Sequence, residues 1–283
     1  MGIAVLGWLG TILWELYVDE PIIDFRLLKN RNFAIASVLF FVFGLGLFGT
    51  TTLVPQLLQA LYGYRAIDAG LVLGPGALVI TVLAPISALL LQRRIVSPRM
   101  MMTFSLSVVG ASLWHFSTMN LDTNGGHYLM GRVFQGIGYG FFFVPVNMIA
   151  YSMLRPEQNN KASSLTNLFR NWGGSFGIAF ITTAAERRQD LHQVNVGSGL
   201  GSSSQSLQQH IHTMTNYLVS KGFTGPDAAI GAFGTIYRQL HDQTQFLAFM
   251  DCFRVIGWIT LASVPLAFFI RKFVPSGEPS AGH

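Results

Sequence analysis

The chain has 283 residues, of which 51% are hydrophobic and 11% are charged. An ordinary soluble domain carries roughly 25% charged residues, and the mean hydropathy here is +0.44, so the composition excludes that class. The net charge of +5 would fit a nucleic-acid partner in a soluble protein, but most of it falls in short loops between apolar stretches. We therefore expect a multi-pass membrane protein without a nucleic-acid partner.

Sites typical of enzymes and metalloproteins are missing from the sequence. Cys252 is the only cysteine, which excludes an intrachain disulfide framework and a thiolate metal cluster. No Walker motif occurs, and the pair His210 and His212 lacks further ligands. We expect no catalytic residues, no enzyme activity, no cofactor and no metal.

Seven apolar stretches meet or approach the length of about 20 residues that a bilayer core requires. The first begins at Met1 without the basic region and cleavage site of a signal peptide, so we interpret it as part of a span that starts further upstream. The fold class is therefore an all-α polytopic membrane bundle of about seven spans, the first one partial. The predicted spans are 1–17, 33–60, 67–91, 100–118, 128–154, 162–185 and 247–270.

Two connecting segments have a character of their own. Residues 18–32 carry apolar side chains at helical spacing beside basic ones, which is typical of a helix at the membrane interface. Five spans then fill residues 33–185. The long segment 186–246 contains a Gly/Ser-rich joint at 197–204, followed by two amphipathic stretches. We expect two helices there that pack on each other, on the membrane surface or on a partner.

Lysines and arginines set the predicted orientation, because cytoplasmic loops retain positive charge. With the first connector inside, the short outer loops keep only Arg65, and the C-terminal tail 271–283 is cytoplasmic. The inner segments then hold ten basic residues, namely Arg26, Lys29, Arg31, Arg93, Arg94, Arg99, Arg155, Lys161, Arg271 and Lys272.

Arg170 is the most unusual residue of the predicted spans. A central arginine costs roughly 2.5–3.5 kcal/mol on insertion scales, so it normally faces a bundle interior or a watered cavity. Its neighbours at spacings of three and four are Ser163, Asn167, Gly174 and Gly177, which share one helical face with it. Two interpretations stay open. Arg170 either locks the bundle by pairing with a polar group or lines a transport path.

Glycines and prolines mark expected contacts and hinges. Small residues allow helices in a membrane to approach closely, and prolines interrupt the backbone hydrogen bonds of a span. The predicted packing glycines are Gly136, Gly140, Gly173, Gly174 and Gly177, and the predicted hinge or kink positions are Pro75, Pro85 and Pro145.

Other polar residues receive weaker expectations. Arg132 and Gln135 lie about one turn from the predicted outer end of their span, so we interpret Arg132 as an arginine that reaches back to the interface. Asn147 lies deeper and is a candidate for a cavity. Asp251 is a weak candidate for proton coupling, because its spacing of three from Arg254 predicts an ion pair.

Four segments, in chain order, resemble the second half of a major facilitator transporter of the fourteen-span EmrB/QacA drug–proton antiporter family. The combination is specific for this family, whereas no single segment is. The segments are FRLLKNRNFAIAS (25–37), VPQLLQALYGYRAIDAGLVLGPGA (54–77), GRVFQGIGYGFFFVPVN (131–147) and KASSLTNLFRNWGGSFGIA (161–179).

This resemblance implies the C-terminal part of a proton-coupled exporter in a bacterial inner membrane, working on amphipathic, drug-like compounds by alternating access. It also implies contact with membrane lipids, with a periplasmic adaptor protein through the long outer segment, and with an N-terminal half that precedes this chain. Phe41, Asn147, Asn167 and Arg170 are the cavity-side candidates. Two alternatives stay open: a non-transporting membrane subunit that binds a partner, and an exporter of a metabolite or lipid.

Overall fold

The computed structural model describes Gly10 and residues 24–199 and 205–271. Every regular element within these residues is an α-helix or a short 3-10 helix, which confirms the predicted all-α fold class. Apart from Gly10, the predicted first span 1–17 lies outside the described residues, and so does the tail beyond Arg271.

The first described hairpin consists of α2 (Arg31–Tyr62) and α3 (Ala66–Gln92), preceded by the 3-10 helix η1 (Phe25–Lys29). The side chain of Asn30 accepts hydrogen bonds from two backbone N–H groups of the first turn of α2, which satisfies donors that lack a partner within the helix. Gly63 ends α2 with φ at 66°, a left-handed conformation that glycine adopts without strain. The chain then reverses into α3.

The second group consists of α4 (Pro98–Phe116), α5 (Gly125–Gly140) and α6 (Phe143–Tyr151). Helices α5 and α6 together form one interrupted span. Pro145 has no N–H to donate, and its ring clashes with the carbonyl group four residues earlier, at Phe141. The interruption between α5 and α6 lies at this position.

The three prolines predicted to bend their spans therefore sit in different surroundings. Pro145 lies within one turn of a helix break. Pro75 and Pro85 lie inside α3, which continues as one α-helix past both of them. Proline is tolerated inside membrane helices where neighbouring groups satisfy the freed carbonyls. A proline in the sequence therefore marks a weakened helix rather than a certain break.

The third group begins with the 3-10 helix η2 (Pro156–Gln158) and contains α7 (Asn159–Gly199), α8 (Gln205–Ser220) and α9 (Gly225–Ser263), which continues into η3 (Val264–Phe269). Helices α7 and α9 have 41 and 39 residues. At about 1.5 Å per residue each is close to 60 Å long, about twice the thickness of a bilayer core.

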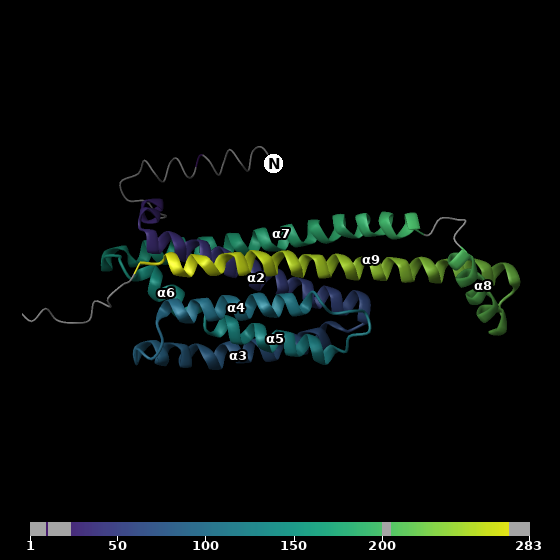
Figure 1. Ribbon diagram of the computed structural model, residues 1–283, viewed down its shortest axis with the longest axis horizontal. Helices are drawn as coiled ribbons and strands as arrows, with labels where there is room; N and C mark the ends of the chain where they lie inside the picture. The colour runs from purple at the N-terminus through teal and green to yellow at the C-terminus, as the bar shows by residue number, and fades with distance from the viewer. Residues whose placement is uncertain (1–9, 11–23, 200–204, 272–283) are drawn as a thin grey trace, which may run out of the picture.

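These long helices project beyond the other helices and carry α8 at their far end (Figure 1). We call this projection the outer arm and define it as residues 186–199 of α7, all of α8, and residues 225–246 of α9. Helix α7 continues to Gly199, so the first residues of the expected Gly/Ser joint are helical. Residues 200–204 lie outside the described part.

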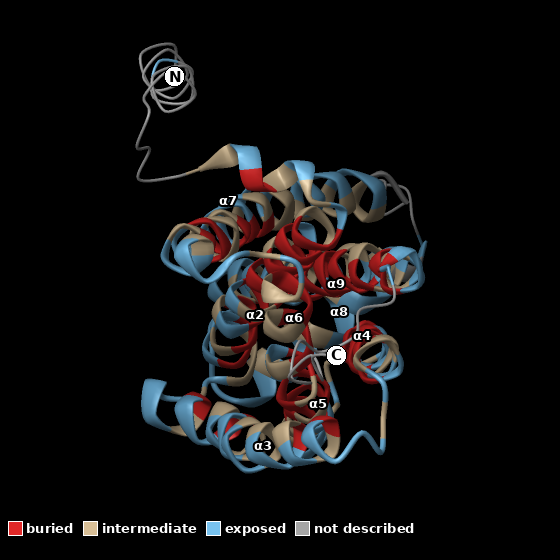
Figure 2. Cartoon of the chain, turned by 90° about the vertical axis from the view of Figure 1, so that its left-hand side faces the viewer, coloured by how far each residue is buried: buried red, intermediate tan, exposed pale blue. Residues whose placement is uncertain are grey.

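Helix α2 occupies the centre of the bundle. It packs against α7, α9 and α6, whereas α3 packs mainly on α5 at one edge. Figure 2 shows the same arrangement, with buried residues gathered on α2 and the helices around it and a mostly exposed α3. The largest fully buried side chains include Phe33, Phe40, Phe142 and Phe253.

Four stretches of the described chain are long and apolar enough to cross a membrane. Helix α4 covers the predicted span 100–118 as far as Phe116, and α7 contains the predicted span 162–185. Both lie alongside the others in the same bundle (Figure 1), and these two spans stay predictions. The four stretches are Arg31–Tyr62, Ala66–Gln92, Gly125–Tyr151 and Gly225–Phe269.

Candidate functional site

Helices α2 and α7 approach each other along a seam of glycines. A Cβ atom added to Gly173 would lie 2.0 Å from the carbonyl oxygen of Phe41. At Gly174 the added atom would lie 2.6 Å from the ring of Phe48, and at Gly177 it would lie 2.8 Å from a backbone oxygen of α2. Such distances leave no room for a side chain. The two backbones therefore lie in direct contact, as small residues permit in membrane bundles.

Arg170 belongs to the same seam. A Cβ atom added to Gly44 of α2 would lie 2.0 Å from the carbonyl oxygen of Arg170. The guanidinium group is partly exposed, and within residues 24–199 and 205–271 it makes no hydrogen bond or ion pair. Asn167, one turn earlier, is exposed. The ring of Phe41 lies beside that of exposed Phe176, with centroids 5.9 Å apart.

Asn147 lies on α6, which packs on a different face of the central helix α2 from the one that α7 contacts. Its side chain donates a hydrogen bond to the carbonyl oxygen of Phe143 at 2.7 Å. The ring of Phe143 contacts Phe40, with centroids 6.1 Å apart. Residues adjacent in a helix point about 100° apart, so Phe40 faces α6 while Phe41 faces α7. The structure therefore brings Phe41 and Arg170 to one seam, with Asn167 exposed one turn from Arg170 on α7, and places Asn147 on another helix contact.

The α3–α5 contact forms a second glycine seam. A Cβ atom at Gly136 would lie 2.4 Å from the carbonyl oxygen of Gly76, and one at Gly140 would lie 2.7 Å from the Cβ atom of Leu83. Glycine thus sets the separation of these two helices as it does for α2 and α7.

A buried polar cluster lies between α5 and α2, at Arg132, Gln135, Tyr139 and Thr50. Arg132 and Gln135 expose 7% and 1% of their surfaces. The Nη1 atom of Arg132 donates to Thr50 Oγ1 at 3.2 Å and to Gln135 Oε1, and Gln135 Nε2 donates to Thr50 Oγ1 at 3.2 Å. Thr50 donates in turn to the carbonyl oxygen of Gly46 at 2.7 Å.

Two donors of this cluster have no acceptor among the described residues. They are Nε of Arg132 and the hydroxyl group of Tyr139. No described carboxylate pairs with Arg132 either, because the ion pairs within residues 24–199 and 205–271 involve other residues. Burying a cation without an anion is costly. The cluster is therefore a positively charged centre with capacity to bind an acceptor.

The interpretation of Arg132 as an interfacial arginine is wrong. Its side chain reaches Thr50, which lies about 18 Å from the outer end of α2 at a rise of about 1.5 Å per residue. The error arose from counting residues to the nearest predicted helix end. Depth depends on which part of a neighbouring helix a side chain meets, and Arg132 meets α2 at Thr50, in its middle part.

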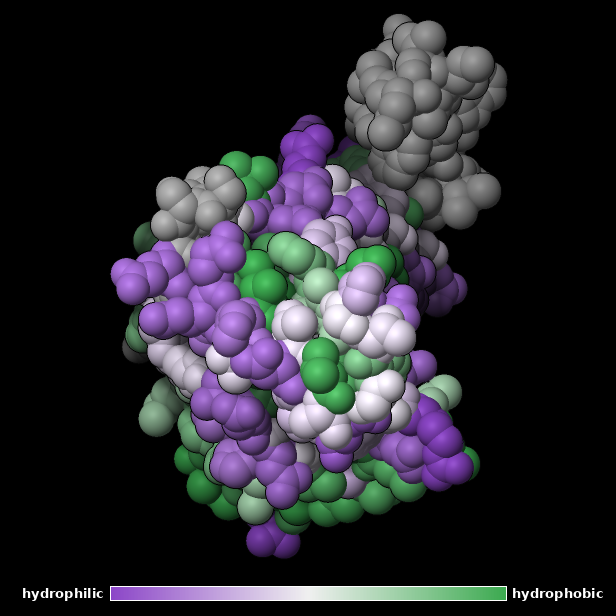
Figure 3. Space-filling model, turned by 90° about the vertical axis from the view of Figure 1, so that its right-hand side faces the viewer, coloured by the Kyte–Doolittle hydropathy of each residue, from purple (hydrophilic) through white to green (hydrophobic). Residues whose placement is uncertain are grey.

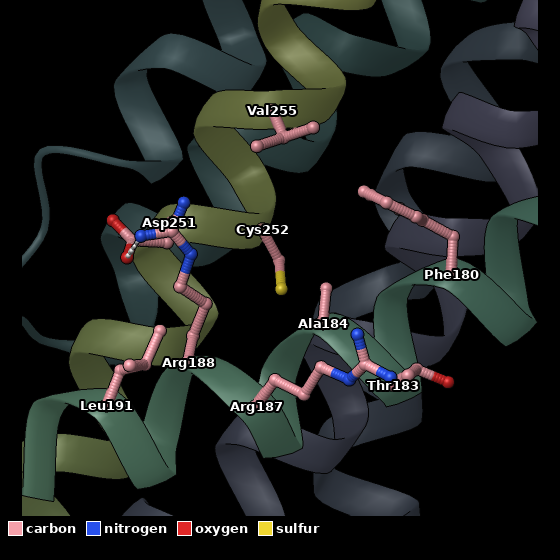
Figure 4. Close-up of a pocket in the computed structure, with 9 residues that line it drawn as sticks. All are labelled: Phe180, Thr183, Ala184, Arg187, Arg188, Leu191, Asp251, Cys252 and Val255. Carbon is pink, nitrogen blue, oxygen red and sulfur yellow. Dashed lines mark ion pairs between the residues drawn. The ribbon is translucent and has the colours of Figure 1, made fainter.

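Asp251 lies in an ionic cluster between α7 and α9. Its carboxylate is 3.6 Å from Arg254 Nη1, so the ion pair predicted from the spacing is confirmed. Two residues of α7 complete the cluster. His192 Nε2 lies 3.0 Å from the carboxylate, and Arg188 Nη1, which Figure 4 shows beside Asp251, lies 3.7 Å from it. The side chain of Asp251 is only 20% exposed, so these partners compensate the partial loss of hydration.

The outer arm carries its own features. Helices α8 and α9 contact each other where Gly231 faces Leu218, and Gln193 of α7 hydrogen-bonds the hydroxyl group of Tyr237 at 3.4 Å. Figure 3 shows hydrophobic side chains intermixed with hydrophilic ones on this end of the molecule. The exposed apolar residues of the arm are Leu191, Val194, Tyr217, Val219, Ile230, Phe233 and Tyr237.

The sequence contained a signal for the buried cluster that our reasoning did not use. Arg132, Gln135 and Tyr139 follow at spacings of three and four, so they form one polar stripe on α5. The partners of Asp251 gave a similar signal, since Arg188 and His192 are four residues apart on α7. Their distance from Asp251 along the chain, about 60 residues, hid the connection.

Comparison with known families gives a match over the first part of the chain. The model of the family described as Major Facilitator Superfamily matches residues 7–178, which is more than half of the chain. Members of this family are transporters rather than enzymes.

Individual relatives align over almost the whole chain. It is 29% identical to the Multidrug export protein EmrB of Escherichia coli (strain K12) over 281 residues, which cover 99% of this chain and 53% of that protein. It is 28% identical to the Fatty acid resistance protein FarB of Neisseria gonorrhoeae over 284 residues, covering 100% of this chain and 54% of that protein. The chain thus spans about half the length of the curated relatives it matches.

Proposed function

Because this chain belongs to the Major Facilitator Superfamily, we propose that it forms the C-terminal part of a proton-coupled exporter of amphipathic compounds. Alternating access rocks one helical bundle against another around a site near the midplane. The described bundle supplies one of the two walls, and a part of the protein outside residues 24–271 supplies the other. The printed name of the E. coli relative, a multidrug export protein, supports this cargo class.

The buried cluster around Arg132 is the observation that carries the proposal. Ionisable residues inside a membrane bundle mark substrate or ion pathways. The two donors of the cluster without an acceptor can bind a substrate or an ion. A packing role alone does not account for them, because it would favour a hydrogen-bond partner for every buried polar group.

We assign the seam between α2 and α7 to the cavity side. Phe41 and Arg170 lie there and Asn167 lies one turn from Arg170 on α7, each at least partly exposed in the described bundle. Asn147 on α6 is the fourth candidate, although its amide group already hydrogen-bonds within its own helix. An aromatic ring and an unpaired guanidinium group along the same seam offer both an apolar surface and a polar contact for an amphipathic compound.

Asp251 remains a weak candidate for proton coupling. A proton carrier must exchange its proton during the cycle, and the carboxylate of Asp251 is engaged with Arg188, His192 and Arg254. We therefore expect the principal coupling acid to lie in a part of the protein other than residues 24–271.

We assign the outer arm to partner binding. Its exposed apolar residues give it a surface for a periplasmic adaptor of a tripartite efflux system, with the protein in a bacterial inner membrane and its C-terminus in the cytoplasm. A non-transporting subunit would use the same surface. The name of the FarB relative, a fatty acid resistance protein, supports the alternative that a lipid or metabolite is the cargo.

A transport assay tests the proposal. The complete gene product, reconstituted in liposomes, should export a lipophilic cation such as ethidium when a proton gradient is imposed, and transport should stop when the gradient is collapsed. Transport that does not depend on the gradient would contradict proton coupling. A fatty acid in place of ethidium tests the alternative cargo in the same liposomes.

Substitution of Arg170 separates its two roles. Arg170→Lys keeps a point charge but cannot form the planar, multiple hydrogen bonds of a guanidinium group. If Arg170 contributes charge to the cavity, the lysine variant should keep most of its export rate and Arg170→Gln should lose it. Equal loss in both variants, with unchanged thermal stability, indicates a role that requires the guanidinium geometry.

A further inference from the structure

A groove between α7 and α9 has the features of a ligand site that the proposed export function does not use. Its volume is about 500 Å³, within the range of small-molecule pockets. Figure 4 shows side chains of both helices directed toward the space between them. The lining residues are Phe180, Thr183, Ala184, Arg187, Arg188, Leu191, Asp251, Cys252 and Val255.

The groove straddles the boundary of the membrane. In α7 the apolar residues 178–185 are followed directly by the charged run 186–190, and charged side chains avoid the hydrocarbon core. Helix α9 runs in the opposite direction, and Arg254 is its last charged residue before the apolar stretch 255–270. Phe180 and Val255 therefore form the end of the groove that faces the hydrocarbon, and Arg187 and Arg188 form the end that faces the headgroups.

The charges of the groove are unbalanced. Arg188, Arg254 and His192 surround the single carboxylate of Asp251. Arg187 makes no ion pair within residues 24–199 and 205–271. Neither neighbouring acid of α7 forms an ion pair with it: Glu186 lines a separate hollow with Gln56 and Gln189, and Asp190 is exposed and makes no ion pair among the described residues. The groove thus keeps a net positive charge at its headgroup end.

We propose that this groove binds an anionic phospholipid. Arg187 and Arg188 hold the phosphate group, because guanidinium groups form strong, charge-assisted hydrogen bonds with phosphate oxygens. One acyl chain lies against Phe180, Ala184 and Val255 and continues into the hydrocarbon core. A positive end at headgroup level and an apolar end below it match the two ends of a lipid.

The bound lipid joins the two helices at the base of the outer arm. The arginines belong to α7, whereas Val255 and Cys252 belong to α9, so one molecule contacts both. The site is therefore expected to favour the paired arrangement of α7 and α9 over a separated one, since a ligand stabilises the conformation that binds it.

Cys252 provides a probe at the site itself. It is the only cysteine of the chain, it is 2% exposed, and its thiol group points into the space between the helices (Figure 4). The purified complete protein would be treated with N-ethylmaleimide in micelles that contain either phosphatidylglycerol or phosphatidylcholine. Modification of the peptide that carries Cys252 would be followed by mass spectrometry, with Cys252→Ala as the blank.

We expect phosphatidylglycerol to slow the modification about tenfold more than phosphatidylcholine does, the factor that about 1.4 kcal/mol of charge-assisted hydrogen bonding produces. Native mass spectrometry supplies a second readout that does not depend on thiol reactivity. It should show one phosphatidylglycerol molecule retained under conditions that remove phosphatidylcholine.

The arginine variants decide whether the headgroup is recognised. Arg187→Gln leaves the Asp251 cluster intact and should abolish most of the lipid preference, and the double variant with Arg188→Gln should abolish the rest. Arg238→Gln, which removes an exposed arginine elsewhere on α9, is the matched control and should keep the preference. Equal protection by both lipids, equal protection by inorganic phosphate alone, or an unchanged preference in the double variant would overturn the proposal.

Discussion

Helices α2 and α3 have nearly the same apolar character but opposite surroundings. In the most apolar 18-residue window of each helix, 67% of the residues of α2 are buried and only 17% of those of α3 are. In water such a difference would follow from amphipathicity, but lipid tails are as apolar as leucine side chains. Apolar content therefore does not decide which membrane helix becomes central.

Small residues at contact positions decide it. Gly44, Gly46 and Gly49 of α2 each have a neighbouring atom within 2.7 Å of an added Cβ, on α7 or α5. In α3, Gly76 has such a neighbour, whereas Gly70 and Gly74 have none within 4 Å. Close approach increases dispersion contacts, which are a main source of stability between membrane helices. Helix α2 makes such approaches on several faces and α3 on one.

Replacement of one glycine by alanine should give the largest difference in stability between the two helices. Gly44→Ala places a methyl group 2.0 Å from the carbonyl oxygen of Arg170, so α2 and α7 must separate. We expect a loss of about 3 kcal/mol or more in the free energy of unfolding. Gly74→Ala meets open space and should be neutral or stabilising by up to about 1 kcal/mol.

Denaturation of both glycine variants in mixed detergent micelles measures these changes. The helical content of each folded variant, followed by circular dichroism, is the control. Equal stability of the two variants would show that the α2–α7 seam does not depend on backbone contact.

Truncation of a leucine to alanine should also destabilise the protein more in α2 than in α3, by a smaller difference in the free energy of unfolding. Leu53 of α2 is fully buried, and Leu78 of α3 is 68% exposed. Because the lipid is apolar, Leu53→Ala loses packing contacts and leaves a cavity, which should cost about 2 kcal/mol. Leu78→Ala should stay within about 0.5 kcal/mol. The same denaturation experiment compares them, and a loss at Leu78 that matches the loss at Leu53 would indicate that another part of the protein covers α3.

Of the glycine, leucine and arginine substitutions, Arg132→Lys should have the smallest effect on stability. It tests the polar contact that α5 makes with the middle of α2. Lysine keeps the charge but cannot hold Thr50 and Gln135 in the same planar geometry, so we expect a loss of about 1–2 kcal/mol. Arg254→Lys, at a half-exposed arginine, is the control and should change stability by less than about 0.5 kcal/mol. Equal losses in thermal unfolding would argue against a structured cluster around Arg132.

The sequence alone was enough to predict the helical fold class and the ion pair between Asp251 and Arg254, because both depend on residues close together in the chain. Hydropathy also located the apolar stretches from which α2, α3 and the interrupted α5–α6 span are built. Local patterns carry this information directly, since the period of a helix is known.

Contacts between helices could not be predicted from local sequence patterns. The depth of Arg132 depends on its register against Thr50, and the environment of Asp251 depends on His192 of α7. The exposure of α3 depends on which of its faces meet other helices. A helix pair in a membrane fixes such a register through shape and small residues rather than through a hydrophobic pattern, so a single sequence leaves it open.

The continuity of α7 from the bundle into the outer arm makes that helix a mechanical lever. It contains 41 residues in one helix, and at about 1.5 Å per residue its ends are about 60 Å apart. A tilt of about 10° about the inner end moves the tip by about 10 Å, which follows from the same length. Any protein held at the tip would thus experience an angular change in the bundle as a displacement large enough to make or break a contact.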